Sequence, residues 1–160
     1  MTKTASGATA GIDAGLDEFV TVYIGGHVFG MAVSDIHDVF APQAITPVPL
    51  SVKEVAGVLN LRGRIVTAID ARARLGLEPS NDQDRPLMAV GIERGGESYG
   101  LIIDRVGEVL RLPVTDFEPN PCNLDQRWHA VTSGVYRLED RLLIVLDIER
   151  MLDFDTEEAA

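Results

Sequence analysis

Histidines and a single cysteine are the side chains of this sequence best suited to hold a metal or attack a substrate. His27, His37 and His129 are far apart in the chain and lack the short spacing of zinc-binding motifs. Cys122 has no nearby run of basic residues that would activate it as a nucleophile. These residues therefore predict neither a metal site nor a cysteine-based active site.

Two aspartates and two glycine pairs have a simpler interpretation than catalysis. Asp70 and Asp147 each precede a short helical pattern, so helix capping accounts for both without paired-carboxylate chemistry. Gly25-Gly26 and Gly95-Gly96 lie between strand-like runs and predict hairpin turns, because a phosphate-binding loop would lead into a helix. Ser133 lacks the strand-turn-helix context of a nucleophile elbow. We therefore expect no enzyme activity, no catalytic residue and no cofactor.

The element that can be predicted best is a hairpin within residues 57–77, GVLNLRGRIVTAIDARARLGL. An apolar run precedes Arg62-Gly63, and an apolar, β-branched run follows it. Glycine supplies the positive φ that a tight hairpin requires, so Arg62 should project from the tip into solvent or toward a partner. Asp70 and Gly76 then begin and end a helix of about two turns.

The same pattern occurs twice in the chain. The segment GVYRLEDRLLIVLDIERML follows residues 57–75 at an offset of 77 (134 − 57), which pairs Asp70 with Asp147. The segment GGESYGLIIDRVGEVL follows GGHVFGMAVSDIHDVF at an offset of 70 (96 − 26), which pairs Phe29 with Tyr99. Two units of about 65–70 residues are thus repeated within one chain.

The repeat predicts two intertwined lobes of similar topology within one domain at residues 17–154. The lobes are expected at about residues 25–77 and 87–152, and they should share a core because a lone unit of this size is marginally stable. Matching framework positions should then superpose, for example Val33 with Ile103 and Ile69 with Leu146.

Many short strands with glycine turns, and few helices, predict a mainly β fold of the barrel or sandwich class. Ser51 and Glu54 form a capping box that predicts one short helix, and a C-terminal helix should begin after Asp147. Residues 34–40 are interpreted as a strand with a jog, while residues 120–132 form a long loop of undefined structure.

The composition of the 160-residue chain excludes several classes of protein. A net charge of −11 and a pI near 4.6 disfavour binding to nucleic acid or to anionic lipid. No apolar run approaches the roughly 18 residues of a membrane span, and a single cysteine excludes an intrachain disulfide framework and fits a reducing cytosol. Residues 1–16 are predicted to be a disordered tail and residues 155–160 an acidic tail, since neither has bulky apolar groups to bury.

The motif NLRG at residues 60–63, followed by IVTAIDARARLGL, resembles the CheW family, the coupling proteins of bacterial chemotaxis. The resemblance covers residues 18–153 and includes LIIDRVGEVL and the closing LIVLDIERML. It implies two SH3-like, five-stranded β-barrels packed side by side. It also implies a non-enzymatic cytoplasmic adaptor, recruited to membrane-associated chemoreceptor arrays, that binds the regulatory domain of the histidine kinase CheA and the cytoplasmic tip of chemoreceptors.

The resemblance implies that receptors bind in a groove between the lobes. The matching groove positions are Ile36, Asp38, Gly57, Asn60, Arg62 and Gly63. The kinase-binding surface has a weaker motif and is not assigned to residues. Three positions depart from the family pattern, with Thr67 in place of a proline, Ala71 in place of a leucine and Leu75 in place of a phenylalanine. These departures bear on affinity and choice of partner rather than on the fold.

Two alternatives remain open from the sequence. The chain could be a CheW-like adaptor of another sensory pathway, such as twitching motility or a developmental kinase array, or, less well supported, a small-ligand-binding β-barrel. Arg62 itself could be an ordinary solvated hairpin arginine. The matching tip of the second unit carries Glu139-Asp140, however, which indicates one scaffold with one tip specialised for recognition. An arginine there can contact a carboxylate through two parallel hydrogen bonds.

Overall fold

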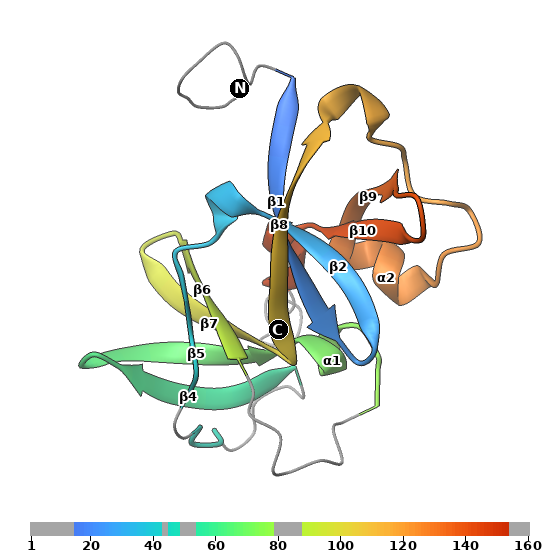
Figure 1. Ribbon diagram of the computed structural model, residues 1–160. Coiled ribbons are helices and arrows are strands. Elements are labelled where there is room, and N and C mark those ends of the chain that lie inside the picture. The colour runs from blue at the N-terminus through green and yellow to red at the C-terminus, as the bar shows by residue number, and fades with distance from the viewer. Residues whose placement is uncertain (1–14, 43–44, 49–53, 79–87, 154–160) are drawn as a thin grey trace.

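The computed structural model describes residues 15–42, 45–48, 54–78 and 88–153, which form two five-stranded sheets joined by short helices (Figure 1). Sheet A contains, in spatial order, β8 (Arg105–Pro113), β1 (Leu16–Ile24), β2 (His27–Ala32), β10 (Leu142–Leu146) and β9 (Thr132–Arg137). Sheet B contains, in the same order, β3 (Asp38–Phe40), β6 (Met88–Arg94), β7 (Glu97–Ile103), β5 (Arg64–Asp70) and β4 (Val55–Leu61). The helical elements are η2 (Val33–Asp35), α1 (Ala71–Arg74), η3 (Val114–Asp116), α2 (Gln126–Val131) and α3 (Ile148–Met151). The predicted mainly β fold is confirmed.

Each sequence unit contributes strands to both sheets. The first unit places β1 and β2 in sheet A but β3, β4 and β5 in sheet B, and the second unit does the reverse. Replacing every strand by its repeat partner, five positions along, turns the order of sheet A into the order of sheet B. The sheets are therefore related by a pseudo-twofold exchange, and neither sheet is made by one unit alone.

The residue pairing shows the same relationship. In sheet B the parallel strands β5 and β7 pair Thr67 with Tyr99, and in sheet A β10 and β2 pair Ile144 with Phe29. These pairs are related by the two predicted offsets, 77 (144 − 67) and 70 (99 − 29). The repeat predicted from the sequence is thus confirmed in the register of the sheets.

One predicted framework pair is correct and the other is wrong. Ile69 and Leu146 occupy matching places in β5 and β10 and are both buried. Val33, by contrast, begins η2 and is 36% exposed, whereas Ile103 ends β7 and is 1% exposed. The chain leaves the strand at Val33 because it turns through a 3-10 helix at this point, and the second unit has only a bend there.

Local sequence signals produce the hairpins and the helix starts. Arg62 and Gly63 adopt φ values of 54° and 83°, the left-handed turn that the β4–β5 hairpin requires. The side chain of Asp70 accepts hydrogen bonds from the backbone N–H groups of Arg72 and Ala73 and caps α1. Asp147 caps α3 in the same way, through the N–H of Arg150. The helix starts predicted from the two aspartates are confirmed.

One glycine in each sheet allows two backbone segments to meet closely, Gly57 in sheet B and Gly134 in sheet A. At Gly57, φ is 148°, and an added Cβ would overlap the carbonyl of Thr46. Thr46 exchanges two 2.8 Å backbone hydrogen bonds with Val58, next to this glycine. In the second unit an added Cβ at Gly134 would overlap Phe117 and the carbonyl of Glu118. A side chain at either glycine would therefore push apart the two backbone segments that meet there.

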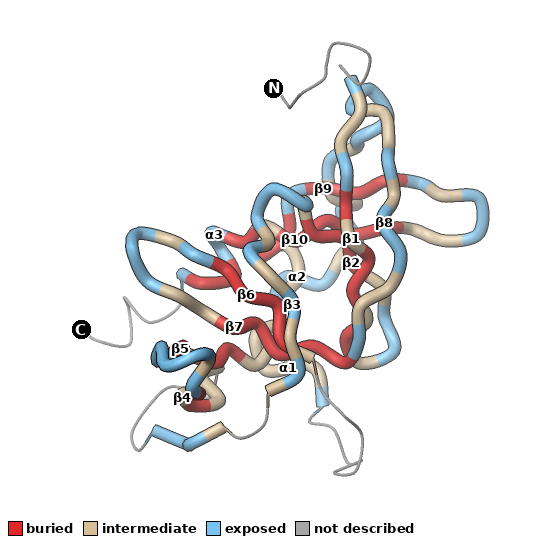
Figure 2. The backbone as a smooth tube through the Cα atoms, turned by 60° about the vertical axis from the view of Figure 1, so that its left-hand side comes forward, coloured by how far each residue is buried: buried red, intermediate tan, exposed pale blue. Residues whose placement is uncertain are grey.

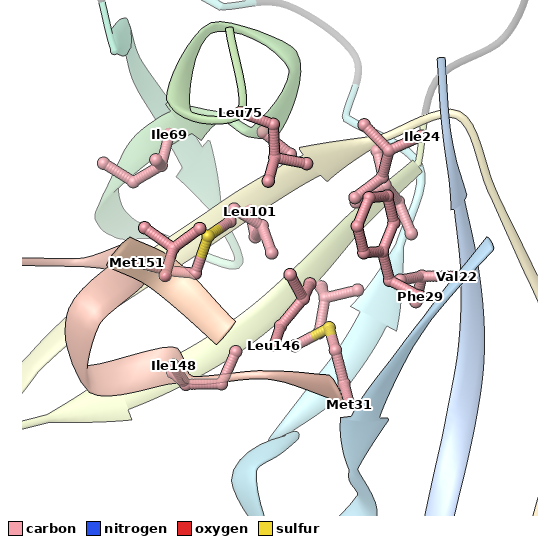
Figure 3. Close-up of a cluster of buried hydrophobic side chains, with 14 of the residues drawn as sticks. Val22, Ile24, Phe29, Met31, Ile69, Leu75, Leu101, Leu146, Ile148 and Met151 are labelled. Carbon is pink, nitrogen blue, oxygen red and sulfur yellow. The ribbon is translucent and has the colours of Figure 1, made fainter. Parts of the chain in front are cut away.

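The largest core cluster lies between the two sheets, and two smaller clusters lie within sheet B and within sheet A. Buried residues concentrate where the sheets face each other, while hairpin tips are exposed (Figure 2). Figure 3 shows the largest cluster, in which Phe29 and Met31 of sheet A approach Leu101 of sheet B and Met151 of α3. One apolar cluster thus includes side chains from both sequence units, which makes the two units a single cooperative core.

Three sequence-based assignments need correction, and others fall outside the described residues. Residues 34–40 are not a continuous strand with a jog, because η2 occupies the first part and β3 begins only at Asp38. The predicted loop at 120–132 contains α2, whose Trp128 donates a 3.0 Å hydrogen bond to the carbonyl of Leu75 and packs against Phe29. Ser51, residues 1–14 and residues 155–160 lie outside the described part of the chain. The helix predicted from Ser51 and Glu54 is wrong from Val55 on, because β4 begins at that residue.

Candidate functional site

The β4–β5 turn brings together three of the residues expected in a binding groove. Asn60 is the exposed residue of β4, one position before the strand ends, and Arg62 and Gly63 form the turn itself. The side-chain oxygen of Asn60 accepts a 2.9 Å hydrogen bond from the N–H of Gly63. The amide therefore holds the turn in the conformation that projects Arg62 outward.

Asp38 on β3 lies within reach of this turn, so a fourth expected residue joins the group. The Arg62 guanidinium nitrogen is 3.8 Å from a carboxylate oxygen of Asp38. The Arg62 side chain is 79% exposed and that of Asp38 is 25% exposed. An ion pair this long and this exposed contributes little to stability, and a partner carboxylate can replace it at small cost.

The other two expected residues have structural roles. Gly57 is buried at the opposite end of β4 from the turn and permits the contact with Thr46. Ile36 is partly buried and packs against the main core cluster, two residues before Asp38. The structure thus groups Asn60, Arg62, Gly63 and Asp38. Gly57 supports β4, the strand that leads into the turn.

Exposed apolar residues next to the turn were not singled out from the sequence. Ile65 is 67% exposed and lies opposite Asn60 in the β4–β5 pairing. Val39, beside Asp38 on β3, is 40% exposed. A guanidinium, an amide and exposed aliphatic groups together have the composition of a protein-binding surface. Alternation along β5 does not identify Ile65, because Ile69 lies on the same face of the strand and is buried.

A second set of charges lies along the same sheet. Arg64 approaches Glu93 at 3.3 Å and donates a 2.6 Å hydrogen bond to the hydroxyl of Ser98. His37 lies 3.6 Å from the same glutamate. These contacts tie β5 to β6, β7 and the segment before β3, so they hold the surface around Arg62 in place.

The matching tip of sheet A differs in backbone and in charge, because Glu139 and Asp140 lack the positive φ angles of Arg62 and Gly63. Leu138 donates a 2.8 Å hydrogen bond to the carbonyl of Arg141 and closes the β9–β10 turn. Glu139 takes the place of Arg62 (139 − 62 = 77), and Glu108 takes that of Asp38 (108 − 38 = 70). Glu108 lies 3.8 Å from Arg141. The tip of sheet A therefore presents acidic groups where the tip of sheet B presents a guanidinium.

The residues first considered for chemistry are not brought together. Over the described ranges, no group of three or more His, Cys, Asp or Glu side chains is arranged to hold a metal ion. His129 contacts the carbonyl of Pro121, His27 packs on Trp128, and Cys122 is exposed. None of the helices in the described part of the chain is both long enough and apolar enough to span a membrane.

Comparison with known proteins gives a consistent family. The family model of the CheW-like domain matches residues 18–155. The chain is 29% identical over 138 residues to the chemotaxis protein CheW of Helicobacter pylori, which covers 86% of this chain and 82% of that protein. It is 31% identical over 121 residues to the chemotaxis protein CheW of Thermotoga maritima, which covers 76% of this chain and 78% of that protein.

A solved structure shares the fold. The scaffolding protein TtCheW of Thermoanaerobacter tengcongensis superposes with a TM-score of 0.75 at 25% sequence identity. The match covers 87% of this chain and 94% of that one. The two sheets described above are thus the two lobes of an SH3-like fold.

Proposed function

Because the chain belongs to the family of CheW-like domains, whose members are chemotaxis scaffold proteins, we propose that it couples chemoreceptors to the histidine kinase CheA. In this role it is a non-enzymatic adaptor. It acts in the cytoplasm and joins receptor arrays at the membrane by binding the cytoplasmic tips of the receptors. Its kinase partner is the regulatory domain of CheA.

The observation that carries this proposal is the exposed Arg62, held at the tip of a braced hairpin beside exposed aliphatic groups. Its guanidinium has only a long contact to Asp38, at 3.8 Å. Binding would exchange that weak contact for hydrogen bonds to a carboxylate or a carbonyl of the receptor tip. Ile65 and Val39 would lose exposed apolar surface in the same step, which provides the hydrophobic part of the binding energy.

The two-lobe architecture supports a second, separate surface for the kinase. The acidic tip at Glu139 lies at the end of the β9–β10 hairpin of sheet A, whereas Arg62 belongs to sheet B. Receptor and kinase can bind to one molecule at the same time only if their binding surfaces do not overlap. The CheA domain should therefore bind outside the group formed by Asp38, Asn60, Arg62 and Gly63.

The proposal is tested by reconstitution from purified components. The protein is titrated with the cognate CheA regulatory domain and with a soluble receptor tip, separately and together, and complexes are measured by sedimentation. We expect both pairwise complexes and one ternary complex, and a change in kinase activity that requires receptor, adaptor and kinase. Binding to neither component, or ATP turnover by the isolated protein that survives repurification, would contradict the proposal.

A further inference from the structure

A cleft of about 450 Å³ opens where β6 of sheet B meets sheet A and α3. Its apolar lining includes Phe19, Tyr136 and Ile92. Burial raises the pKa of Tyr136 to about 12, with Asp17 and then Asp116 adding to the rise, so the phenol stays neutral. Of the described residues that line the cleft, none belongs to the β4–β5 hairpin. The cleft therefore excludes Arg62, although its lining residue Glu93 pairs with Arg64 of that hairpin.

The pseudo-twofold exchange gives this cleft a counterpart, which is closed by an arginine. Arg72 of α1 binds Asp104 through two hydrogen bonds, from Nε at 3.1 Å and from a terminal nitrogen at 2.7 Å. Both side chains are largely buried, at 16% and 8% exposure. Beside them, the guanidinium of Arg105 stacks 3.8 Å above the ring of Tyr23. Two cations thus occupy this junction and pair with its anion and its aromatic ring.

The open cleft carries different residues at the same four positions. Glu149 replaces Arg72 (149 − 72 = 77), and Ser34 replaces Asp104 (104 − 34 = 70). By the same offset of 70, Asp35 replaces Arg105 (105 − 35) and Glu93 replaces Tyr23 (93 − 23). All four replacements line the cleft. Where the closed junction has two arginines, the open one has three carboxylates and a hydroxyl.

The carboxylate of Asp35 faces like charges in the free protein. Partial desolvation raises the pKa of the Asp35 carboxyl, and the charges of Asp147 and then Glu149 raise it further. Arg94 is the one cation among the described lining residues, and it lies 3.5 Å from Glu149, whose side chain is 77% exposed. Basic groups outside the lining pair with Glu93 (Arg64 and His37) and with Asp147 (Arg150), so Asp17 and Asp35 are the lining carboxylates that have no ion pair within the described ranges.

We infer that this cleft binds an arginine side chain of a partner protein, presented on a segment with apolar residues on either side. The guanidinium takes the place that Arg72 takes in the closed junction, between Asp35 and the carboxylates at the start of α3. The apolar neighbours cover Phe19 and Tyr136. Arginine fits better than lysine because its planar fork can bind carboxylates from two elements at once. The inference does not depend on coupling of receptor to kinase.

Peptide binding observed by NMR tests the inference directly. The probe is Ac-Ala-Leu-Arg-Leu-Ala-NH2, titrated into isotopically labelled protein. Its control is the same peptide with citrulline, which keeps the shape of arginine and lacks its charge. We expect saturable shifts at Asp35, Tyr136 and Glu149 with the arginine peptide and at least tenfold weaker binding of the citrulline peptide. Absence of saturation at millimolar arginine peptide, equal binding of both peptides, or shifts confined to other surfaces would overturn the inference.

Two cleft variants and one control variant distinguish binding in the cleft from general charge attraction. Asp35→Asn with Glu149→Gln should weaken binding of the arginine peptide about tenfold, a loss of about 1.4 kcal/mol. Ser34→Asp with Glu149→Arg rebuilds the ion pair of the closed junction and should abolish the shifts by filling the cleft from within. Glu139→Gln with Asp140→Asn removes the same formal charge at the distant tip and should leave binding unchanged. Equal weakening by the tip variant and the cleft variant would also overturn the inference.

Discussion

Sheet A and sheet B have the same strand order and register, yet they differ in charge at two matched places. At the hairpin tips, sheet B carries Arg62 and sheet A carries Glu139. Where the sheets meet the short helices, Arg72 and Asp104 close the junction at α1, while Glu149 and Ser34 leave the junction at α3 open. The apolar framework repeats and the polar positions diverge. The fold therefore depends on the repeated residues, and recognition can depend on the ones that differ.

The residues at the two junctions explain why a cleft is open at Glu149 and closed at Arg72. A guanidinium that fills the junction from its own chain satisfies the buried carboxylate of Asp104, which also accepts a 2.9 Å hydrogen bond from the N–H of Gly25. With Glu149 in the matching place, the cation nearby is Arg94, 3.5 Å from Glu149, and the Asp35 carboxylate faces the like charges of Asp147 and Glu149. Each prediction below changes one member of a matched pair.

The largest effect is expected from Arg72→Ala. Removal of the guanidinium takes away a charged partner of Asp104, which is 8% exposed, and breaking such a buried pair costs about 3–5 kcal/mol. The matched change Glu149→Ala should alter stability by less than about 0.5 kcal/mol because that side chain is largely in water. Denaturant unfolding measures both. The double change Arg72→Met with Asp104→Leu should recover much of the loss, and a cost for Arg72→Ala no larger than that for Glu149→Ala would show that the pair does not hold the junction.

The next effect concerns the closure glycines. Gly57→Ala and Gly134→Ala should each lower the free energy of unfolding by about 1–3 kcal/mol, because the new methyl groups overlap backbone of the facing segments. Gly57→Ala should cost more, since its φ of 148° also disfavours a side chain. Gly26→Ala is the control, with positive φ and open space around the Cβ. If the control loses as much stability as the other two, close packing is not the reason for these glycines.

A smaller effect, on binding alone, is expected from Arg62→Glu. Receptor binding should weaken at least tenfold, about 1.4 kcal/mol, because the guanidinium is lost and like charge is added. Binding to the kinase domain should stay within a factor of a few, and circular dichroism should show an unchanged fold. The matched change Glu139→Arg should spare receptor binding. Titration of both variants against each partner decides the matter, and wild-type affinity of Arg62→Glu for receptor would leave Arg62 an ordinary solvated side chain.

The smallest effect is a pH dependence at Asp35. The pKa of Asp35 is raised in the folded state above its ordinary value of 3.8. Between the ordinary and the raised pKa, the folded protein therefore binds more protons than the unfolded chain. Stability of the wild type relative to Asp35→Asn should therefore fall as pH rises through that interval and stay level above it. At neutral pH the variant should be more stable by no more than about 0.5 kcal/mol. Thermal unfolding against pH checks this, and Glu149→Gln should reduce the gain from Asp35→Asn. A variant less stable than the wild type at neutral pH would mean that Asp35 has a favourable partner.

The candidate site was predictable from sequence in part. The turn at Arg62-Gly63 follows from residues within a few positions of each other, as does the cap by Asp70, and both are present. The approach of Asp38 to Arg62 was expected from the family resemblance alone, because 24 residues (62 − 38) separate them and the contact depends on how sheet B curls. Residues 34–40 were misread because their apolar spacing fits a strand and a helical turn equally well.

The sequence by itself determined the β-strands, the glycine turns, the aspartate caps and the repeat at offsets of 70 and 77, since each depends on local torsional preference or on direct comparison of residues. Only the tertiary structure decided that each unit divides its strands between two sheets. Backbone donors and acceptors are chemically alike on every strand edge, so local sequence cannot choose among partners. The pairing of Arg72 with Asp104, and the open cleft at Glu149, follow from that choice because they form only where the two units meet.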